Sequence, residues 1–244
     1  MTAIKTINLT KKYKDETVVD KLNLEIEEGQ LFALLGVNGA GKSTTIKMLS
    51  CLIPPTNGDA VLLGDSIKKN SIKVKEKINV SPQETAVAPN LSVRENLEFI
   101  SSIYCQNRAK AHKNADKIIE DFGLSEIAGK KAKILSGGWQ RRLSIAMALI
   151  SEPKILFLDE PTLGLDVLAR KELWNIIEKL KGKITIILTT HYLEEAEALS
   201  DKIGIMVKGR LVALGTAEEI KTQAGKDKFE DAFIKLCENG GSNK

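Results

Sequence analysis

Short apolar runs recur along the chain and predict buried strands. The runs at 31–35, 155–158 and 184–188 are apolar at nearly every position, which is typical of strands covered on both faces of a parallel sheet. Three further segments predict strands, namely 19–26 (with one local irregularity), 60–63 and 78–80. Helical stretches separate these runs, so the pattern predicts an α/β fold on a mostly parallel sheet.

Between about residues 84 and 151 the periodicity is helical. Ser92 and Glu95 have the spacing of a capping box, and the apolar positions that follow keep helical spacing as far as Tyr104. A second helix is expected over 109–121, closed by Gly123. This middle part of the chain is therefore expected to form a helical lobe.

The last third of the chain returns to strand–helix alternation. A hairpin is expected at Lys208-Gly209. Two short helices, at 217–223 and 228–237, are expected to precede a polar tail at 239–244.

Residues 36–43 match the phosphate-binding pattern G-x-x-x-x-G-K-[ST] at every fixed position. The match lies between the strand at 31–35 and an expected helix at 45–52, which Pro54 stops. Glycines let backbone N–H groups approach phosphate oxygens, and the helix start adds unpaired donors. Lys42 can reach the β- and γ-phosphates, and the Ser43 hydroxyl can hold Mg²⁺. The residues expected to bind the nucleotide in this loop are Gly36, Asn38, Gly39, Ala40, Gly41, Lys42, Ser43 and Thr44.

The strand at 155–158 runs into two carboxylates, Asp159 and Glu160. Ligands of parallel sheets bind beyond the carboxyl ends of the strands. Both carboxylates are therefore expected next to the phosphate loop. Mg²⁺ takes oxygen ligands and keeps several waters, so Asp159 is suited to hold one of these waters. Glu160 is suited to polarise the water that attacks the γ-phosphate.

A second anion-binding helix start is expected at Ser136-Gly137-Gly138, which presents a hydroxyl and bare backbone. The full segment, Leu-Ser-Gly-Gly-Trp-Gln over 135–140, resembles the signature of ATP-binding cassette (ABC) ATPases. The order of motifs over roughly residues 4–216 is similar to that family, most of all to the ATPases of drug exporters. Trp139 departs from the smaller residue common in the signature; it either packs at an interface or is half exposed.

The resemblance implies a fold and further site residues. The expected fold is a P-loop NTPase core with a mostly parallel sheet, an N-terminal antiparallel β part and a helical subdomain. Residues 1–216 form the ABC ATPase domain in this interpretation, with the helical subdomain at about 84–151, and 217–244 is a C-terminal extension. By resemblance, Tyr13 stacks on adenine, Gln83 contacts Mg²⁺ or its water, and His191 contacts the γ-phosphate. The residues expected to contact ATP across a dimer are Ser136, Gly137, Gly138, Gln140 and the D-loop Asp166.

Composition limits the remaining function classes. Three cysteines (Cys51, Cys105 and Cys237) at unrelated spacings predict neither a disulfide framework nor a metal cluster, and favour a reducing compartment. No signal-peptide core or membrane-spanning apolar run is found. The net charge of +4 is spread along the chain without interleaved aromatic residues, so no nucleic-acid partner is expected. His112 lies among basic residues and is expected on a solvated helix face.

The resemblance also implies a function. We expect an ATPase that uses ATP and Mg²⁺ and dimerises head to tail around two ATP molecules, as a homodimer or with a related chain. Closure would power export through a separate integral membrane permease, which contacts the segment 83–104, with the ATPase on the cytoplasmic face of the membrane. The alternative is a soluble ABC ATPase without a permease, such as an iron–sulfur assembly ATPase. A single cassette argues against the two-cassette translation factors, and the absence of sustained heptads argues against chromosome-maintenance ATPases.

Overall fold

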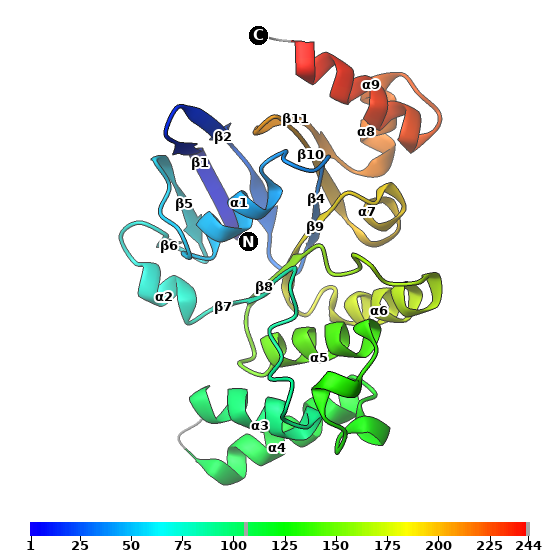
Figure 1. Cartoon of the computed structure of the whole chain (residues 1–244). Coiled ribbons are helices and arrows are strands. Elements are labelled where there is room, and N and C mark those ends of the chain that lie inside the picture. The colour runs from blue at the N-terminus through cyan, green and yellow to red at the C-terminus, as the bar shows by residue number, and fades with distance from the viewer. Residues whose placement is uncertain (105–106, 243–244) are drawn as a thin grey trace.

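The computed structural model describes residues 1–104 and 107–242. Cys105 and the last two residues of the expected polar tail, 243–244, lie outside the described residues. The chain folds around two sheets, with a helical lobe on one side (Figure 1).

The larger sheet has six strands in the order β11-β10-β4-β9-β8-β7. Pairing is parallel from β10 to β7, and only β11 runs antiparallel, which confirms the predicted mostly parallel sheet. The central strands β4, β8 and β9 are buried at every position, as their apolar sequences predict. The bounds are β4 Leu31–Leu35, β7 Ile78–Ser81, β8 Ile155–Asp159, β9 Thr185–Thr190, β10 Lys202–Val207 and β11 Arg210–Gly215.

The second sheet is antiparallel and comes from the N-terminal part of the chain. Its strands are β1 (Thr2–Tyr13), β2 (Glu16–Leu22), β3 (Glu25–Glu27), β5 (Asn57–Leu62) and β6 (Asp65–Ser66), with both β2 and β3 on β1. The prediction of one strand at 19–26 is therefore wrong. The ladder breaks at Asn23, whose side-chain amide pairs with Asn8, a residue with a left-handed φ of 48°.

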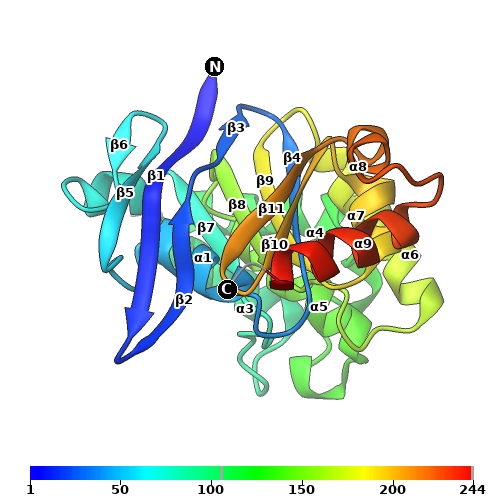
Figure 2. The same cartoon turned by 90° about the horizontal axis from the view of Figure 1, so that it is seen from above.

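Helix α1 (Lys42–Leu49) lies between the two sheets (Figures 1 and 2). Ile46, Met48 and Leu49 pack in one core with Ile4 of β1 and Phe157 of β8. The helix begins three residues earlier than expected and ends at Leu49, because Cys51 takes a left-handed conformation with φ 57°. Four further helices surround the core, namely α2 (Ser71–Lys75), α6 (Val167–Leu180), α7 (Leu193–Leu199) and α8 (Ala217–Ala224).

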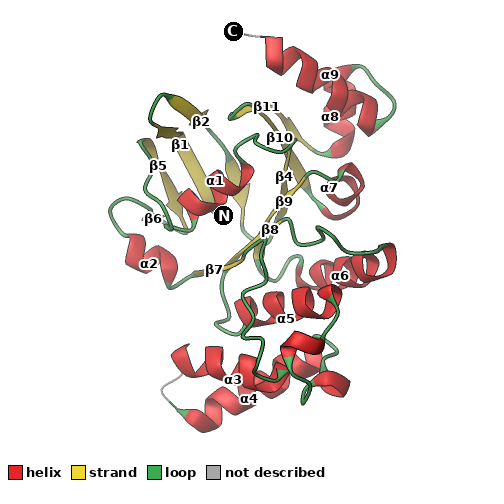
Figure 3. Ribbon diagram, viewed as in Figure 1, coloured by secondary structure: helices red, strands yellow, loops and turns green. Residues whose placement is uncertain are grey.

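The helical lobe contains α3 (Val93–Tyr104), α4 (Arg108–Asp121) and α5 (Gly137–Leu149), and it carries no strand among its described residues (Figure 3). The capping box is present: Glu95 N donates to Ser92 Oγ at 3.1 Å, and Ser92 N donates to Glu95 Oε2 at 2.7 Å. Short 3₁₀ turns, Ser125–Ile127 and Ala132–Ile134, precede α5. Helix α5 also packs on the core, because Leu143 and Ala146 share one cluster with Leu158 of β8.

The C-terminal extension packs on the sheet edge formed by β10 and β11 (Figure 2). Helix α9 (Phe229–Ser242) continues beyond the expected end at 237, so most of the expected polar tail is helical. The hairpin at Lys208-Gly209 is confirmed, with φ 46° and 80° at the two turn residues. No helix of the described residues has the length and apolar character to cross a membrane.

Candidate nucleotide-binding and catalytic site

The phosphate loop joins β4 to α1 and needs glycine at its crowded positions. A Cβ on Gly36 would lie 2.5 Å from the Met206 carbonyl oxygen, and a Cβ on Gly41 would lie 2.5 Å from that of Val18. Gly41 also has φ 100°, a left-handed value that favours glycine. The loop is therefore packed tightly on β10 and β2, with its open side toward a cavity.

This cavity has a volume of about 420 Å³ and brings together motifs that are far apart in the sequence. Gln83, Glu160 and His191 all line it, although they follow three different strands. The remaining lining residues are Val18, Asn38, Gly39, Ala40, Gly41, Lys42, Ser43, Thr44 and Leu163. The cavity thus collects most of the residues predicted for one chain's share of the site.

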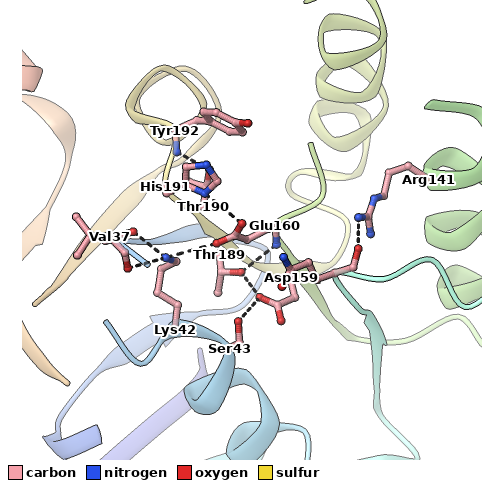
Figure 4. A network of polar contacts seen from close by, with 12 residues as sticks. Val37, Lys42, Ser43, Arg141, Asp159, Glu160, Thr189, Thr190, His191 and Tyr192 are labelled. Carbon is pink, nitrogen blue, oxygen red and sulfur yellow. Dashed lines mark hydrogen bonds and ion pairs between the residues drawn. The ribbon is translucent and has the colours of Figure 1, made fainter. Parts of the chain in front are cut away.

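Lys42 points across the loop toward Glu160 (Figure 4). Its Nζ donates to the carbonyl oxygens of Gly36 at 2.7 Å and Val37 at 3.1 Å, and lies 3.5 Å from Oε1 of Glu160. Burial lowers the pKa of Lys42, and the Glu160 carboxylate opposes part of that shift. The loop therefore holds a desolvated cation where an anion could replace its present partners.

Asp159 and Ser43 place two hard oxygen atoms side by side. Ser43 Oγ donates to Asp159 Oδ1 at 3.0 Å, and Thr189 Oγ1 donates to the same carboxylate oxygen at 2.5 Å. Hydroxyl and carboxylate oxygens are ligands that Mg²⁺ accepts, so these residues fit the ion. No group of three or more His, Cys, Asp or Glu side chains suited to a metal occurs in the described ranges. An ion at Ser43 and Asp159 would consequently need further oxygen ligands, such as water or phosphate.

Glu160 is held rigidly just past the end of β8. Its backbone has a left-handed φ of 47°, and its N–H donates to both the carbonyl and the hydroxyl oxygen of Thr189, at 3.1 and 3.0 Å. Left-handed backbone at a residue other than glycine costs energy and is concentrated at functional sites. Nδ1 of His191 lies 3.1 Å from Oε2 of Glu160, and the rings of His191 and Tyr192 contact each other at a tilt of 38°, with their centroids 4.3 Å apart. The carboxylate thus has a fixed direction into the cavity.

The signature segment lies outside this cavity. Ser136 precedes α5 and is exposed, and a Cβ on Gly137 would meet no atom within 4 Å. Gly138 packs on α6, where an added Cβ would lie 3.1 Å from the Cβ of Ala169. Gln140 uses its amide locally, because Nε2 donates to the carbonyl oxygens of Ala132 and Leu135.

Trp139 is half-buried in the single chain. Its ring packs on the hydrophobic core, and the guanidinium of Arg142 lies 4.3 Å from the ring centroid. The cation–π contact holds the ring along its own helix.

Three other predicted residues lie apart from the cavity lining. Tyr13 is 47% exposed at the end of β1, with Lys11 Nζ 5.1 Å from its ring centroid. Asp166 is exposed and caps α6, where its Oδ1 accepts from Ala169 N at 2.9 Å. His112 lies on α4 with its side chain 45% exposed, as expected for a solvated helix face, and its Nδ1 lies 2.8 Å from Glu98 Oε1.

Thr189 and Arg141 contact the site and were not predicted. Thr189 ends an apolar strand with a second threonine, and that polar pair was the available signal. Arg141 lies on the buried side of α5 and donates through Nη1 to the carbonyl oxygen of Pro82 at 2.6 Å. A basic residue at an apolar helical position was its only signal in the sequence.

Comparison with known proteins agrees with this geometry. Residues 19–163 match the family described as ABC transporter. The chain belongs to this family. A shorter match, over residues 134–195, is to a family described as AAA domain, putative AbiEii toxin, Type IV TA system.

Curated relatives cover nearly the whole chain. It is 40% identical over 241 residues to "Probable multidrug ABC transporter ATP-binding protein YbhF" of Escherichia coli, covering 96% of this chain and 42% of that protein. It is also 40% identical over 221 residues to "Linearmycin resistance ATP-binding protein LnrL" of Bacillus subtilis, covering 90% and 71% of the two chains. This chain therefore spans less than half the length of the first relative and most of the second.

A solved structure shares the fold over most of this chain. The dimeric, post-hydrolysis ATP-binding cassette MJ0796 bound to ADP and Pi superposes with a TM-score of 0.79 at 26% identity, covering 87% of this chain and 98% of that one. The P-loop core, the antiparallel sheet and the helical lobe together are the fold of an ABC ATPase, and the chain carries the ATP-hydrolysing domain of the family.

Proposed function

We propose that this chain is the ATPase subunit of a transporter and that two copies close head to tail around two ATP molecules. Each ATP would lie between the phosphate loop of one copy and the signature segment of the other. The observation that carries this proposal is the separation of the two motifs: none of Ser136, Gly137 and Gly138 lines the cavity that the phosphate loop opens into. A site that needs both motifs is completed by a second copy.

The surface beside the signature supports the same arrangement. Val167 and Leu168, at the start of α6, are 65% and 74% exposed, and Gly138 packs on Ala169 immediately after them. Exposed aliphatic side chains next to a candidate ligand site favour a surface that becomes buried on association. The similar cassette MJ0796 is described as a dimer bound to ADP and Pi.

Within one copy, the residues in and around the cavity have separate roles in this proposal. Lys42 and the loop N–H groups bind the phosphates, and Tyr13 stacks on the adenine. Ser43, Asp159 and Gln83 would hold Mg²⁺, which when bound neutralises charge on the phosphate oxygens. Glu160 accepts a proton from the attacking water, and Nδ1 of His191 keeps that carboxylate oriented.

The partner in the membrane is part of the same proposal. The relatives are described as a multidrug transporter protein and a linearmycin resistance protein, which supports export as the direction. We place the chain at the cytoplasmic face of the membrane, attached through a separate permease. Co-expression with a membrane protein encoded beside this chain tests this placement: joint purification and permease-dependent ATPase activity would support it, and a fully active chain that binds no such partner would favour the permease-free alternative.

Nucleotide binding itself is tested by Lys42→Ala, with Lys47→Ala as the control on the same helix. Lys42→Ala should weaken ATP affinity by about 10- to 150-fold, which corresponds to the ~1.5–3 kcal/mol of a hydrogen bond to a charged group. Lys47 is exposed on α1 and lines no part of the cavity, so its variant should bind ATP normally. Equal affinity in the two variants, measured by titration calorimetry, would remove the basis of the assignment.

A further inference from the structure

Helix α5 holds the end of β7 and the loop after it through two side chains on one face. Arg141 and Ser144 are three positions apart, which puts both on the same side of the helix. Ser144 Oγ lies 3.1 Å from Ser81 Oγ, and Arg141 donates through Nη1 to the Pro82 carbonyl oxygen and through Nη2 to that of Gln83. The last residue of β7 and the two loop residues after it are therefore held by α5, although they precede the helix by more than fifty residues.

The Arg141 guanidinium donates these two hydrogen bonds to carbonyl oxygens, and it forms no ion pair in the described part of the chain. It is buried, and burial lowers its pKa, with the negative charge of Asp159 acting in the opposite direction. A buried charge without a carboxylate partner is costly unless its donors are satisfied. The planar guanidinium can reach two successive carbonyl oxygens at once, which the single ammonium of a lysine cannot do in the same way.

The two ends of this connection are parts of the proposed site. Gln83 lines the phosphate-loop cavity, and α5 begins directly after Ser136 at the signature. We propose that Arg141 is a positioning residue that couples the Gln83 loop to the signature helix, so that the two segments move as one unit. The inference rests on the proposed function, in which Gln83 contacts the bound Mg²⁺ or its water and the signature contacts the nucleotide of a second copy.

A rigid link of this kind has a consequence for catalysis. A displacement of Gln83 caused by the γ-phosphate would change the direction of α5 and of Ser136 at its start. In the reverse direction, docking of the signature on a second copy would fix Gln83 over the nucleotide. Loss of the link should consequently lower turnover while leaving the phosphate-loop contacts, and hence nucleotide affinity, intact.

The test compares Arg141→Gln, Ser144→Ala and Gln83→Ala with the double variant Arg141→Gln/Gln83→Ala. ATP affinity is measured without added Mg²⁺, steady-state ATPase activity with it, and folding by thermal melting. Arg141→Gln should keep its affinity and lose about 10- to 100-fold in kcat, the usual cost of misplacing a catalytic group by ~1 Å. Ser144→Ala removes one hydroxyl contact and should lose less. Arg210→Gln is the control, because Arg210 is an exposed arginine paired with Asp20 on β2.

The double variant decides how Arg141 acts. If Arg141 acts through Gln83, the double variant loses no more kcat than the more damaged single variant. Losses that multiply would overturn the inference while leaving the role of Gln83 in place. A Gln83→Ala chain with normal turnover would instead overturn the proposed role of Gln83, and the coupling with it. If Arg141→Gln fails to fold, the same comparison is made with Ser144→Ala and Ser144→Ala/Gln83→Ala.

Discussion

Nζ of Lys42 lies 3.5 Å from Oε1 of Glu160, so the proposed phosphate-binding cation and the proposed base form a buried ion pair. Both side chains have further partners. Lys42 donates to the carbonyl oxygens of Gly36 and Val37, and Glu160 lies within hydrogen-bond distance of Nδ1 of His191. An arriving γ-phosphate would compete with Glu160 for Lys42. Binding would thereby free the carboxylate at the moment when it is needed to polarise water.

Glu160→Gln should separate binding from hydrolysis. Turnover should fall by about 10²–10⁴-fold, the usual contribution of a general base. ATP affinity should be equal or higher, because the amide no longer competes with the phosphate for Lys42. An ATP-loaded dimer should then accumulate and elute early in size-exclusion chromatography.

Glu178→Gln is the matched control for this variant, since Glu178 is exposed on α6 and lines no part of the cavity. It should hydrolyse ATP like the unaltered chain. Normal turnover in Glu160→Gln would contradict its role as the base, and weaker binding would contradict the competition for Lys42.

Mixing two inactive variants tests whether the site is shared. Ser136→Arg places a bulky cation at the exposed start of α5 and should block hydrolysis while sparing ATP binding to the single chain. Lys42→Ala should also be inactive, because it weakens ATP binding at the phosphate loop while its signature segment is unchanged. A mixture of the two should regain part of the activity, because one composite site of each mixed dimer carries neither change. Activity that stays absent at every mixing ratio would refute independent, shared sites.

The acidic side chain of Glu195 gives a pH-dependent prediction. Glu195 is fully buried on α7, with Oε1 accepting from Trp174 Nε1 at 3.0 Å. Burial raises its pKa above the ordinary 4.5 and outweighs the nearby Thr190, Thr162 and Trp174 donors. The contribution of Glu195 to the free energy of unfolding is therefore fully present below about pH 4.5. It is lost as the pH rises through the pKa that Glu195 has in the folded chain.

Glu195→Gln removes this titration and keeps the acceptor for Trp174. Relative to the unaltered chain, its melting temperature should improve between about pH 5 and about pH 8. The exposed variant Glu178→Gln should show no such relative change. A Glu195→Gln chain that becomes relatively less stable at the higher pH would mean that the carboxylate is ionised and satisfied in the fold.

How far the sequence predicts this molecule depends on the range of the interaction concerned. The strands at 31–35 and 155–158 follow from their own apolar residues, and the phosphate loop follows from its own glycines. The contacts of Arg141 with Pro82 and Gln83 bridge more than fifty residues, so no local pattern contains them. These contacts follow only from how α5 packs on β7.

Helix α9 shows a local signal that tertiary packing overrides. Asn239 and Gly240 have low helix propensity and predict a loop. In the structure, Gly240 lies in α9 against β11, where an added Cβ would lie 2.5 Å from Cγ1 of Val212. The glycine that suggests the end of a helix is therefore the residue that lets this helix approach the strand.

The permease-docking surface is the last prediction. The proposal places it at 83–104, the segment that starts at the cavity and continues into α3. Phe99, Ile103 and Tyr104 are exposed on α3, an apolar group that favours a partner. Phe99→Asp, and likewise Glu84→Lys or Asn90→Trp, should lower co-purification with the permease while the isolated chain keeps its ATPase activity.

The C-terminal extension provides the control for docking. Ile234 on α9 is exposed to a similar degree, so Ile234→Asp adds the same charge to an apolar surface site at the opposite end of the molecule (Figure 1). Its co-purification with the permease should equal that of the unaltered chain. If Ile234→Asp loses the permease while Phe99→Asp retains it, docking belongs to the 217–244 extension, and coupling cannot run through the Gln83 loop into α3.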